Sequence, residues 1–161
     1  MTESESPDIE TSVVSYLTAR PSRDLVIAAR RMWTREWWEM ASQTWTLRIS
    51  DRVLEEASRG DSRAAALRID ALRGIEALPI TPEAEILAAR LIDRQALPPT
   101  EPEDALHVAL ATVSAAHYLV TWNFAHLVGP DTKLKLLDTL RACGYCPPLL
   151  TTPEELLEIM K

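Results

Sequence analysis

The sequence predicts an α/β fold: a three-layer α/β/α sandwich in which helices cover both faces of a central, mostly parallel sheet. Short runs of β-forming residues alternate with longer amphipathic segments, as in repeated strand–helix units. Residues 118–122 form an unbroken run rich in β-formers, as expected of a strand buried on both faces. Residues 105–116 are apolar nearly all the way round a helix, which indicates that this helix is buried as well.

Length and composition set limits on the class of protein. With 161 residues, 47% of them hydrophobic, the chain has enough apolar surface for one core, and we interpret residues 1–161 as a single domain with a loose start at 1–7. No run of about 18 apolar residues occurs, and the first residues, MTESESPD, are acidic rather than signal-like. We therefore expect a cytoplasmic protein without a membrane partner.

The net charge narrows the possible relationship with nucleic acid. A charge of −7 argues against a protein that coats nucleic acid through overall basicity, because such binding depends on Lys and Arg displacing counterions. It does not argue against a nuclease that works through carboxylates and a metal ion. It is also compatible with a basic protein partner.

The chain is predicted to begin with one short strand and two helices. Ile9 begins the strand, and Thr11 or Ser12 then caps a short helix. Ser22 caps a longer helix over residues 23–43. The longer helix carries apolar residues at i, i+3 and i+4 spacing, which form one buried face: Val26, Ala29, Trp33, Trp37 and Met40.

A second face of the long helix carries Arg31, Arg35 and Trp38. Basic and aromatic residues interleaved on a helix can follow an RNA backbone and stack on bases, or they can receive a protein partner. The simpler interpretation is a core of tryptophans and a solvated face of arginines. We adopt that interpretation for Trp33 and Trp37 and leave Trp38 open.

A second strand and helix follow. Alternating apolar residues over 45–49 predict a strand that runs into Ser50, and the next helix holds Glu55 and Glu56 before it ends near Gly60. Successive residues on a helix are about 100° apart, so only one of these two glutamates should face any given site.

The rest of the chain continues the alternation. We predict a helix over 61–73 and a strand over 75–80, which Pro79 places at an edge or a strand end. A helix then starts at Pro82 with Thr81 as its cap. Near the end of the chain we predict a helix over 132–143 with Leu134, Leu137 and Leu140 inward, a strand at 149–150, and a final helix capped by Thr152 with Glu155.

Polar side chains recur where predicted strands give way to helices. Glu10 follows the first strand, Glu55 and Glu56 follow the second, Asp104 opens the buried helix, and Asn123 follows its strand. Ligands of open α/β sheets gather outside the carboxyl ends of the strands. We therefore expect these groups to line one acidic pocket, although Asp104 alone is also an ordinary helix-start residue and Asn123 alone an ordinary turn former.

Several segments together carry a family resemblance. Their order and spacing resemble a PIN domain, and more narrowly the VapC-like toxin ribonucleases of type II toxin–antitoxin systems, from about Asp8 to near the end of the chain. The matching segments are IETSVVSYL, ISDRVLEEASRGD, LPPTEPEDALHVALA, YLVTWNF and GYCPPLLTTPEEL.

The resemblance implies a fold, an activity and partners. It implies a PIN-like sandwich and a divalent-metal-dependent endoribonuclease in which Glu10, Asp104 and Glu56 hold Mg²⁺ or Mn²⁺. Asn123 would supply a neutral oxygen or orient a ligand. The implied partners are an RNA substrate, a small antitoxin protein and, in a homodimer, a second copy of the chain. The family's usual spacing favours Glu56 over Glu55.

Two positions differ from the family pattern. Glu10 stands where Asp is usual, and Asn123 stands where an Asp often follows the strand. The lower negative charge at Asn123 favours one bound metal over two. These departures also support an alternative, a catalytically lapsed PIN-like module that binds RNA or protein.

Other chemistries receive less support. His107 is interpreted as a hydrogen-bonded core residue, and His117 and His126 show no ligand spacing, so we place no histidine in the mechanism. Cys143 and Cys146 form a C-x-x-C pair without two further zinc ligands. The chain has no G-x-S-x-G turn, and its four glycines leave no phosphate-binding loop.

Overall fold

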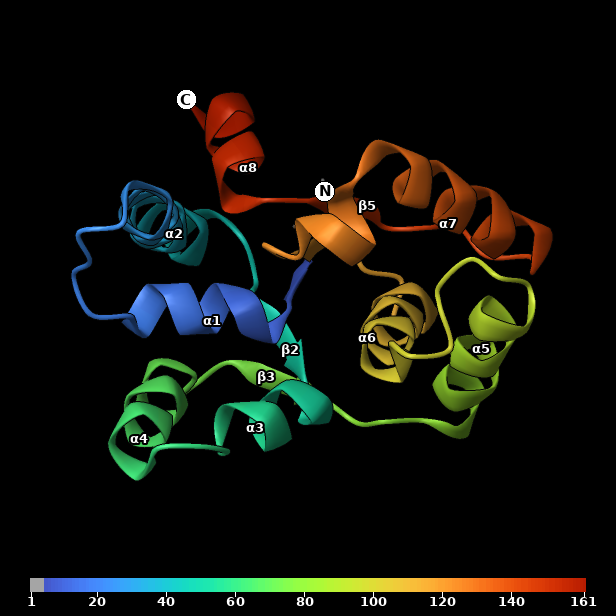
Figure 1. The fold of residues 1–161 in the computed structure, drawn as a ribbon, viewed down its shortest axis with the longest axis horizontal. Helices are drawn as coiled ribbons and strands as arrows, with labels where there is room; N and C mark the ends of the chain where they lie inside the picture. Colours follow the sequence, from blue (N-terminus) through green and yellow to red (C-terminus); the bar gives the residue numbers. More distant parts are fainter. Residues whose placement is uncertain (1–4) are drawn as a thin grey trace.

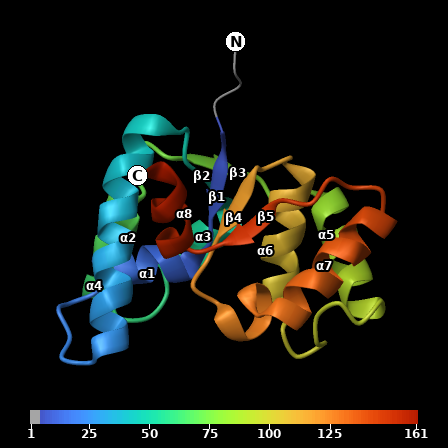
Figure 2. The same ribbon diagram turned by 90° about the horizontal axis from the view of Figure 1, so that it is seen from above.

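The fold is built on a five-stranded sheet in which every neighbouring pair of strands is parallel, with helices on both faces (Figure 1 and Figure 2). The computed structural model describes residues 5–161. The strands are β1 (Pro7–Ile9), β2 (Arg48–Ser50), β3 (Glu76–Leu78), β4 (Tyr118–Val120) and β5 (Leu149–Thr151), in the spatial order β3-β2-β1-β4-β5. The predicted three-layer α/β/α class is confirmed, and β3 lies at an edge.

The helices form two layers that Figure 2 shows on opposite sides of the sheet. One layer contains α1 (Thr11–Thr18), α2 (Leu25–Thr44), α3 (Asp51–Ala57), α4 (Ser62–Ala71) and α8 (Pro153–Met160). The other contains α5 (Pro82–Asp93), α6 (Pro102–Val113), the π-helical turn η1 (Phe124–Val128) and α7 (Pro130–Ala142). Within residues 5–161, no helix has both the length and the apolarity to cross a membrane.

Strand β4 contributes to a hydrophobic core on each side of the sheet. Leu119 packs among residues of α5, α6 and α7, whereas Val120 packs among residues of α1, α2 and α8. The two side chains separate because successive residues of a strand point to opposite faces. Helix α6 is buried along most of its length, as its apolar sequence predicts.

The tryptophans of α2 belong mainly to the core. Trp37 is wholly buried, as predicted. Trp33 is half-buried and stacks on Trp122 with 6.2 Å between ring centroids. Trp38 is also half-buried, edge-on to Trp37. The side chain of Arg31 donates a hydrogen bond to the carbonyl of Ala19, so it ties α2 to the end of α1.

Helix starts show where local sequence signals are decisive. Ser50, Thr81 and Thr152 cap α3, α5 and α8, each through a side-chain oxygen that accepts a backbone N–H of the first turn. Two predicted caps are wrong. Asp24 rather than Ser22 caps α2, and Glu10 rather than Thr11 or Ser12 caps α1. In each case the carboxylate accepts a hydrogen bond from a free backbone N–H group of the first turn.

Three further predictions require correction. Val26, predicted on the buried face of α2, is 57% exposed. Residues 1–7 were predicted to be loose. Residues 1–4 lie outside the described residues, but Pro7 is the first residue of β1. Ser6, just before it, donates its backbone N–H to the imidazole of His117. Leu134 is 63% exposed rather than inward. Leu140 is buried as predicted, and Leu136 takes the inward place of Leu134, because Leu136 and Leu140 are one turn apart on the face that meets the sheet.

Candidate functional site

The candidate site lies where β1 and β4 run side by side at the centre of the sheet. The connection from β1 leads towards β2 and β3, whereas the connection from β4 leads towards β5, so the chain leaves these two strands in opposite directions. In open α/β sheets such a reversal leaves a crevice outside the carboxyl ends of the strands. Glu10 follows β1 directly, and residues 121–123 follow β4.

Glu10 joins the ends of these two strands. It is 9% exposed, and its Oε2 accepts hydrogen bonds from the backbone N–H of Ser12 at 3.0 Å, from Thr121 Oγ1 at 2.9 Å and from the Ser12 hydroxyl. The Ser12 hydroxyl oxygen in turn accepts the backbone N–H of Trp122 at 2.9 Å. These bonds fix one oxygen of Glu10, while no hydrogen bond among residues 5–161 engages Oε1.

Glu56 is held by a buried histidine. Its Oε1 lies 2.6 Å from His107 Nε2 and accepts a hydrogen bond from Thr11 Oγ1 at 2.8 Å. Burial opposes the charged forms of both partners, but the contact with His107 lowers the pKa of Glu56, and the contact with Glu56 and the charge of Glu10 raise the pKa of His107. The neighbouring Glu55 is exposed and pairs with Arg52 at 2.8 Å, so one glutamate of the pair faces inward.

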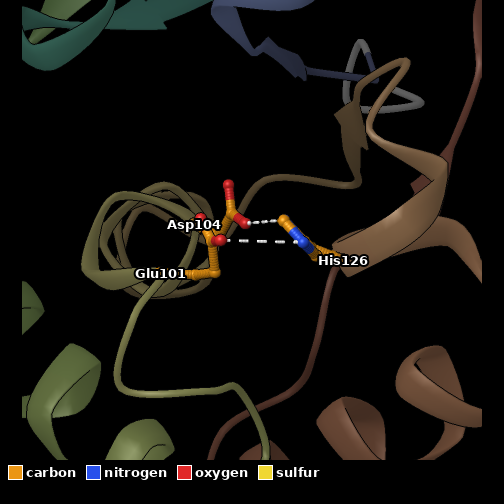
Figure 3. A group of neighbouring side chains, drawn as sticks. All are labelled: Glu101, Asp104 and His126. Carbon is orange, nitrogen blue, oxygen red and sulfur yellow. Dashed lines mark ion pairs between the residues drawn. The ribbon is translucent and has the colours of Figure 1, made fainter.

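Asp104 occupies the first turn of α6 and faces η1, as Figure 3 shows. It is 8% exposed. Asn123 Nδ2 donates to Asp104 Oδ1 at 3.0 Å, and Asn123 Oδ1 accepts the backbone N–H of His126 at 3.2 Å. His126 Nδ1 lies 2.8 Å from Asp104 Oδ2, and His126 Nε2 lies 3.7 Å from Glu101 Oε1.

One oxygen of Asp104 is buried without a hydrogen bond. Oδ2 makes no hydrogen bond with good geometry among residues 5–161, although His126 Nδ1 lies at ion-pair distance from it, 2.8 Å away. Burial raises the pKa of Asp104, and the charges of Glu101 and Glu10 add to this, while the charge of His126 opposes it. An oxygen so placed is ready to bind a cation.

The structure brings some of the predicted site residues together more closely than others. Among residues 5–161, the group of three metal-binding side chains with ligand atoms within 4.8 Å of one another is Glu101, Asp104 and His126. Asn123 contacts two of these residues. Glu10 and Glu56 lie at neighbouring junctions with their own partners and are not in this group, so their role as metal ligands stays a prediction.

The sequence analysis missed His126. Its position, three residues beyond Asn123, showed no ligand spacing, because its two acidic neighbours precede it by more than twenty residues. The available signal was topological: a polar residue just after the central strand β4 has to lie near the start of the helix that precedes that strand. Glu101, just before α6, is the other acidic neighbour of His126, whereas Glu103 forms an ion pair with Arg52.

The comparisons with known proteins bear on the fold. No family model matches the chain, and no curated protein matches it in sequence. Among solved structures, the chain is similar to one in the crystal structure of VapBC2 from Rickettsia felis bound to a DNA fragment from their promoter, with a TM-score of 0.58 and 15% identity. The match covers 91% of this chain and 98% of that chain. The protein therefore has the PIN-like α/β/α fold that its sequence predicts.

Proposed function

We propose that this protein is a divalent-metal-dependent endoribonuclease and the toxin of a toxin–antitoxin pair. The observation that carries the proposal is Asp104, a buried carboxylate with one oxygen that accepts no hydrogen bond, at the carboxyl edge of a PIN-like sheet. The donor set suits a divalent cation, since carboxylate oxygens are the ligands that Mg²⁺ and Mn²⁺ prefer. The fold and the carboxylates support the proposal jointly.

The proposed roles of the residues follow from their contacts. Asp104 would hold the ion together with Glu10, and Glu56 would assist directly or through water. Asn123 keeps one oxygen of Asp104 engaged, which would leave the other oxygen for the ion. His107 keeps Glu56 ionised in its half-buried position. When bound, a divalent ion supplies charge neutralisation and a stronger water nucleophile for phosphodiester hydrolysis.

The partners belong to the proposal. The similar crystal structure contains VapBC2 bound to promoter DNA, and this supports a small antitoxin as the partner of this chain too. The acidic net charge of −7 favours a partner with a basic segment. We further propose a homodimer, and a cytoplasmic location, where RNA substrate is available.

RNA cleavage by the purified full chain tests the proposal. Structured and unstructured RNAs are incubated with Mg²⁺, Mn²⁺ or EDTA, beside Asp104→Asn and Asp104→Ala. Asp93→Asn is the matched control, because Asp93 is an exposed carboxylate at the end of α5. Cleavage should require metal, disappear in both Asp104 variants and persist in Asp93→Asn.

A second function is favoured by the Asn123 contact. Its neutral amide stands beside Asp104 where another carboxylate would strengthen cation binding, and this supports a PIN-like module that binds RNA or protein without cutting. If folded wild type, free of antitoxin, is as inactive as Asp104→Ala across the RNA panel, this binding module becomes the better description.

A further inference from the structure

The start of α6 and the turn η1 meet at three side chains that can all bind metals. Glu101 precedes α6, Asp104 lies in its first turn, and His126 projects from η1 (Figure 3). One ligand atom from each lies within 4.8 Å of the others. The cluster thus joins the segment that enters β4 to the segment that leaves it.

The buried oxygen of Asp104 is an observation independent of this clustering. Asp104 is 8% exposed, and its Oδ2 has no hydrogen-bond partner within residues 5–161. A desolvated carboxylate oxygen is costly unless a donor or a cation compensates it. Oδ2 lies 2.8 Å from His126 Nδ1, a separation at which both atoms can bind the same cation at adjacent coordination positions.

Asn123 fixes the relative position of two of the three ligands. Its amide nitrogen donates to Asp104 Oδ1 at 3.0 Å, and its amide oxygen accepts the backbone N–H of His126 at 3.2 Å. The side chain therefore spans α6 and η1. Such outer hydrogen bonds hold ligands in place and leave Oδ2 and the imidazole edge available.

We propose that Glu101, Asp104 and His126 form a mixed nitrogen–oxygen site that selects a borderline divalent ion, such as Co²⁺ or Zn²⁺, over Mg²⁺. Imidazole nitrogen suits these ions, whereas Mg²⁺ favours oxygen ligands and retained water. The inference rests on the metal half of the proposed function, because Asp104 is common to both. It goes further by naming His126 as a ligand and a class of ion.

Metal affinity, measured without RNA, tests this site. The full chain is stripped with EDTA and dialysed, Co²⁺ binding is followed by visible absorption, and Mg²⁺ binding by calorimetry. The variants are His126→Ala and His126→Asp. His117→Ala is the control, because His117 is an exposed histidine at the opposite end of β4, where it contacts Ser6.

The expected results are specific to His126. Wild type and His117→Ala should bind Co²⁺ at least about tenfold more tightly than Mg²⁺, and His126→Ala should lose at least about tenfold in Co²⁺ affinity while Mg²⁺ affinity changes less than about threefold. His126→Asp creates an all-oxygen site and should shift the preference towards Mg²⁺.

Unchanged Co²⁺ affinity in folded His126→Ala, or an unchanged preference in folded His126→Asp, overturns the proposal. If circular dichroism shows that a variant is unfolded, the wild type decides: substoichiometric Mn²⁺ should broaden the ring proton signals of His126 before those of His117, and equal broadening overturns the site. Selective binding without RNA cleavage would instead contradict only the nuclease proposal.

Discussion

His107 Nε2 lies 2.6 Å from Glu56 Oε1, and this contact connects the middle of buried helix α6 to helix α3. The histidine is 4% exposed, while the Glu56 side chain keeps 20% of its surface. Each partner shifts the other's pKa towards the charged form, which favours the ion-paired state of the contact. The pair holds one candidate site carboxylate in a fixed position.

Replacing His107 should therefore cost stability. His107→Ala leaves Glu56 half-buried without its counter-charge and removes packed atoms from α6, so the free energy of unfolding should fall by about 2–4 kcal/mol at neutral pH. We place the loss below that of a fully buried pair because water still reaches Glu56. Urea denaturation measures it. His117→Ala should change stability by less than about 0.5 kcal/mol, and an equal effect of the two variants would contradict the ion-pair interpretation.

Glu10 allows its structural and metal-binding roles to be separated. Glu10→Gln keeps an amide oxygen that can accept the Ser12 N–H, so stability should stay within about 0.5 kcal/mol of wild type, whereas Glu10→Ala loses the cap of α1 and about 1–2 kcal/mol. Both variants should bind Mn²⁺ at least about tenfold more weakly, since each removes a charge from the site. Thermal unfolding and calorimetry provide the two measurements. Wild-type Mn²⁺ affinity in Glu10→Gln would show that Glu10 is not a ligand.

Asn123→Asp should lower the stability of the metal-free protein and raise its affinity for metal. The new carboxylate cannot donate to Asp104 Oδ1 as the amide does, and it places a second negative charge beside a carboxyl group whose pKa is already raised by burial. Without metal, the free energy of unfolding should fall by about 1–2 kcal/mol, and saturating Mn²⁺ should recover at least that amount. Denaturant melts with EDTA and with Mn²⁺ measure both quantities.

Asn123→Ala serves as the comparison for that experiment. It loses the same donor but adds no charge, so its stability should fall without a gain in Mn²⁺ affinity. If Asn123→Asp binds Mn²⁺ no better than Asn123→Ala, the carboxylate at this position does not face the ion.

Helix α7 offers a matched pair of leucines that tests its orientation. Leu136 is wholly buried and Leu134 is 63% exposed, although they are only two residues apart. Leu136→Ala should lower the free energy of unfolding by about 2–5 kcal/mol, and Leu134→Ala by less than about 0.5 kcal/mol. Chemical denaturation distinguishes them. Equal losses would mean that α7 is rotated on the sheet.

The sequence predicted those features that depend on neighbouring residues. Periodicity identified the strands and most helices, and side-chain chemistry identified the caps Thr81 and Thr152. Errors arose where two local candidates competed, as at Asp24 against Ser22. The predicted orientation of Leu134 was wrong because α7 has leucines on several sides, and only the packing of α7 against the sheet decides which of them are buried.

The part of the site that could be predicted follows from one rule, that the carboxyl ends of parallel strands meet at the same edge of the sheet. That rule correctly placed Asn123 beside Asp104 and located Glu10 at the adjoining strand end. It did not predict that η1 would fold His126 back over the start of α6, since this depends on the tertiary path of the connection between β4 and α7. Nor did the sequence reveal that His107 would engage Glu56.

The hydrogen bond between Glu10 and Thr121 joins residues 111 positions apart, so the ribosome adds these two residues at very different times. Strand β1 emerges early, but β4, Asn123 and His126 emerge only when about three quarters of the chain has been made. Domains assemble as synthesis proceeds, and an unfinished chain cannot form contacts with segments not yet translated. The candidate site is therefore among the last parts of the molecule to form, and the nascent chain lacks this site for most of its synthesis.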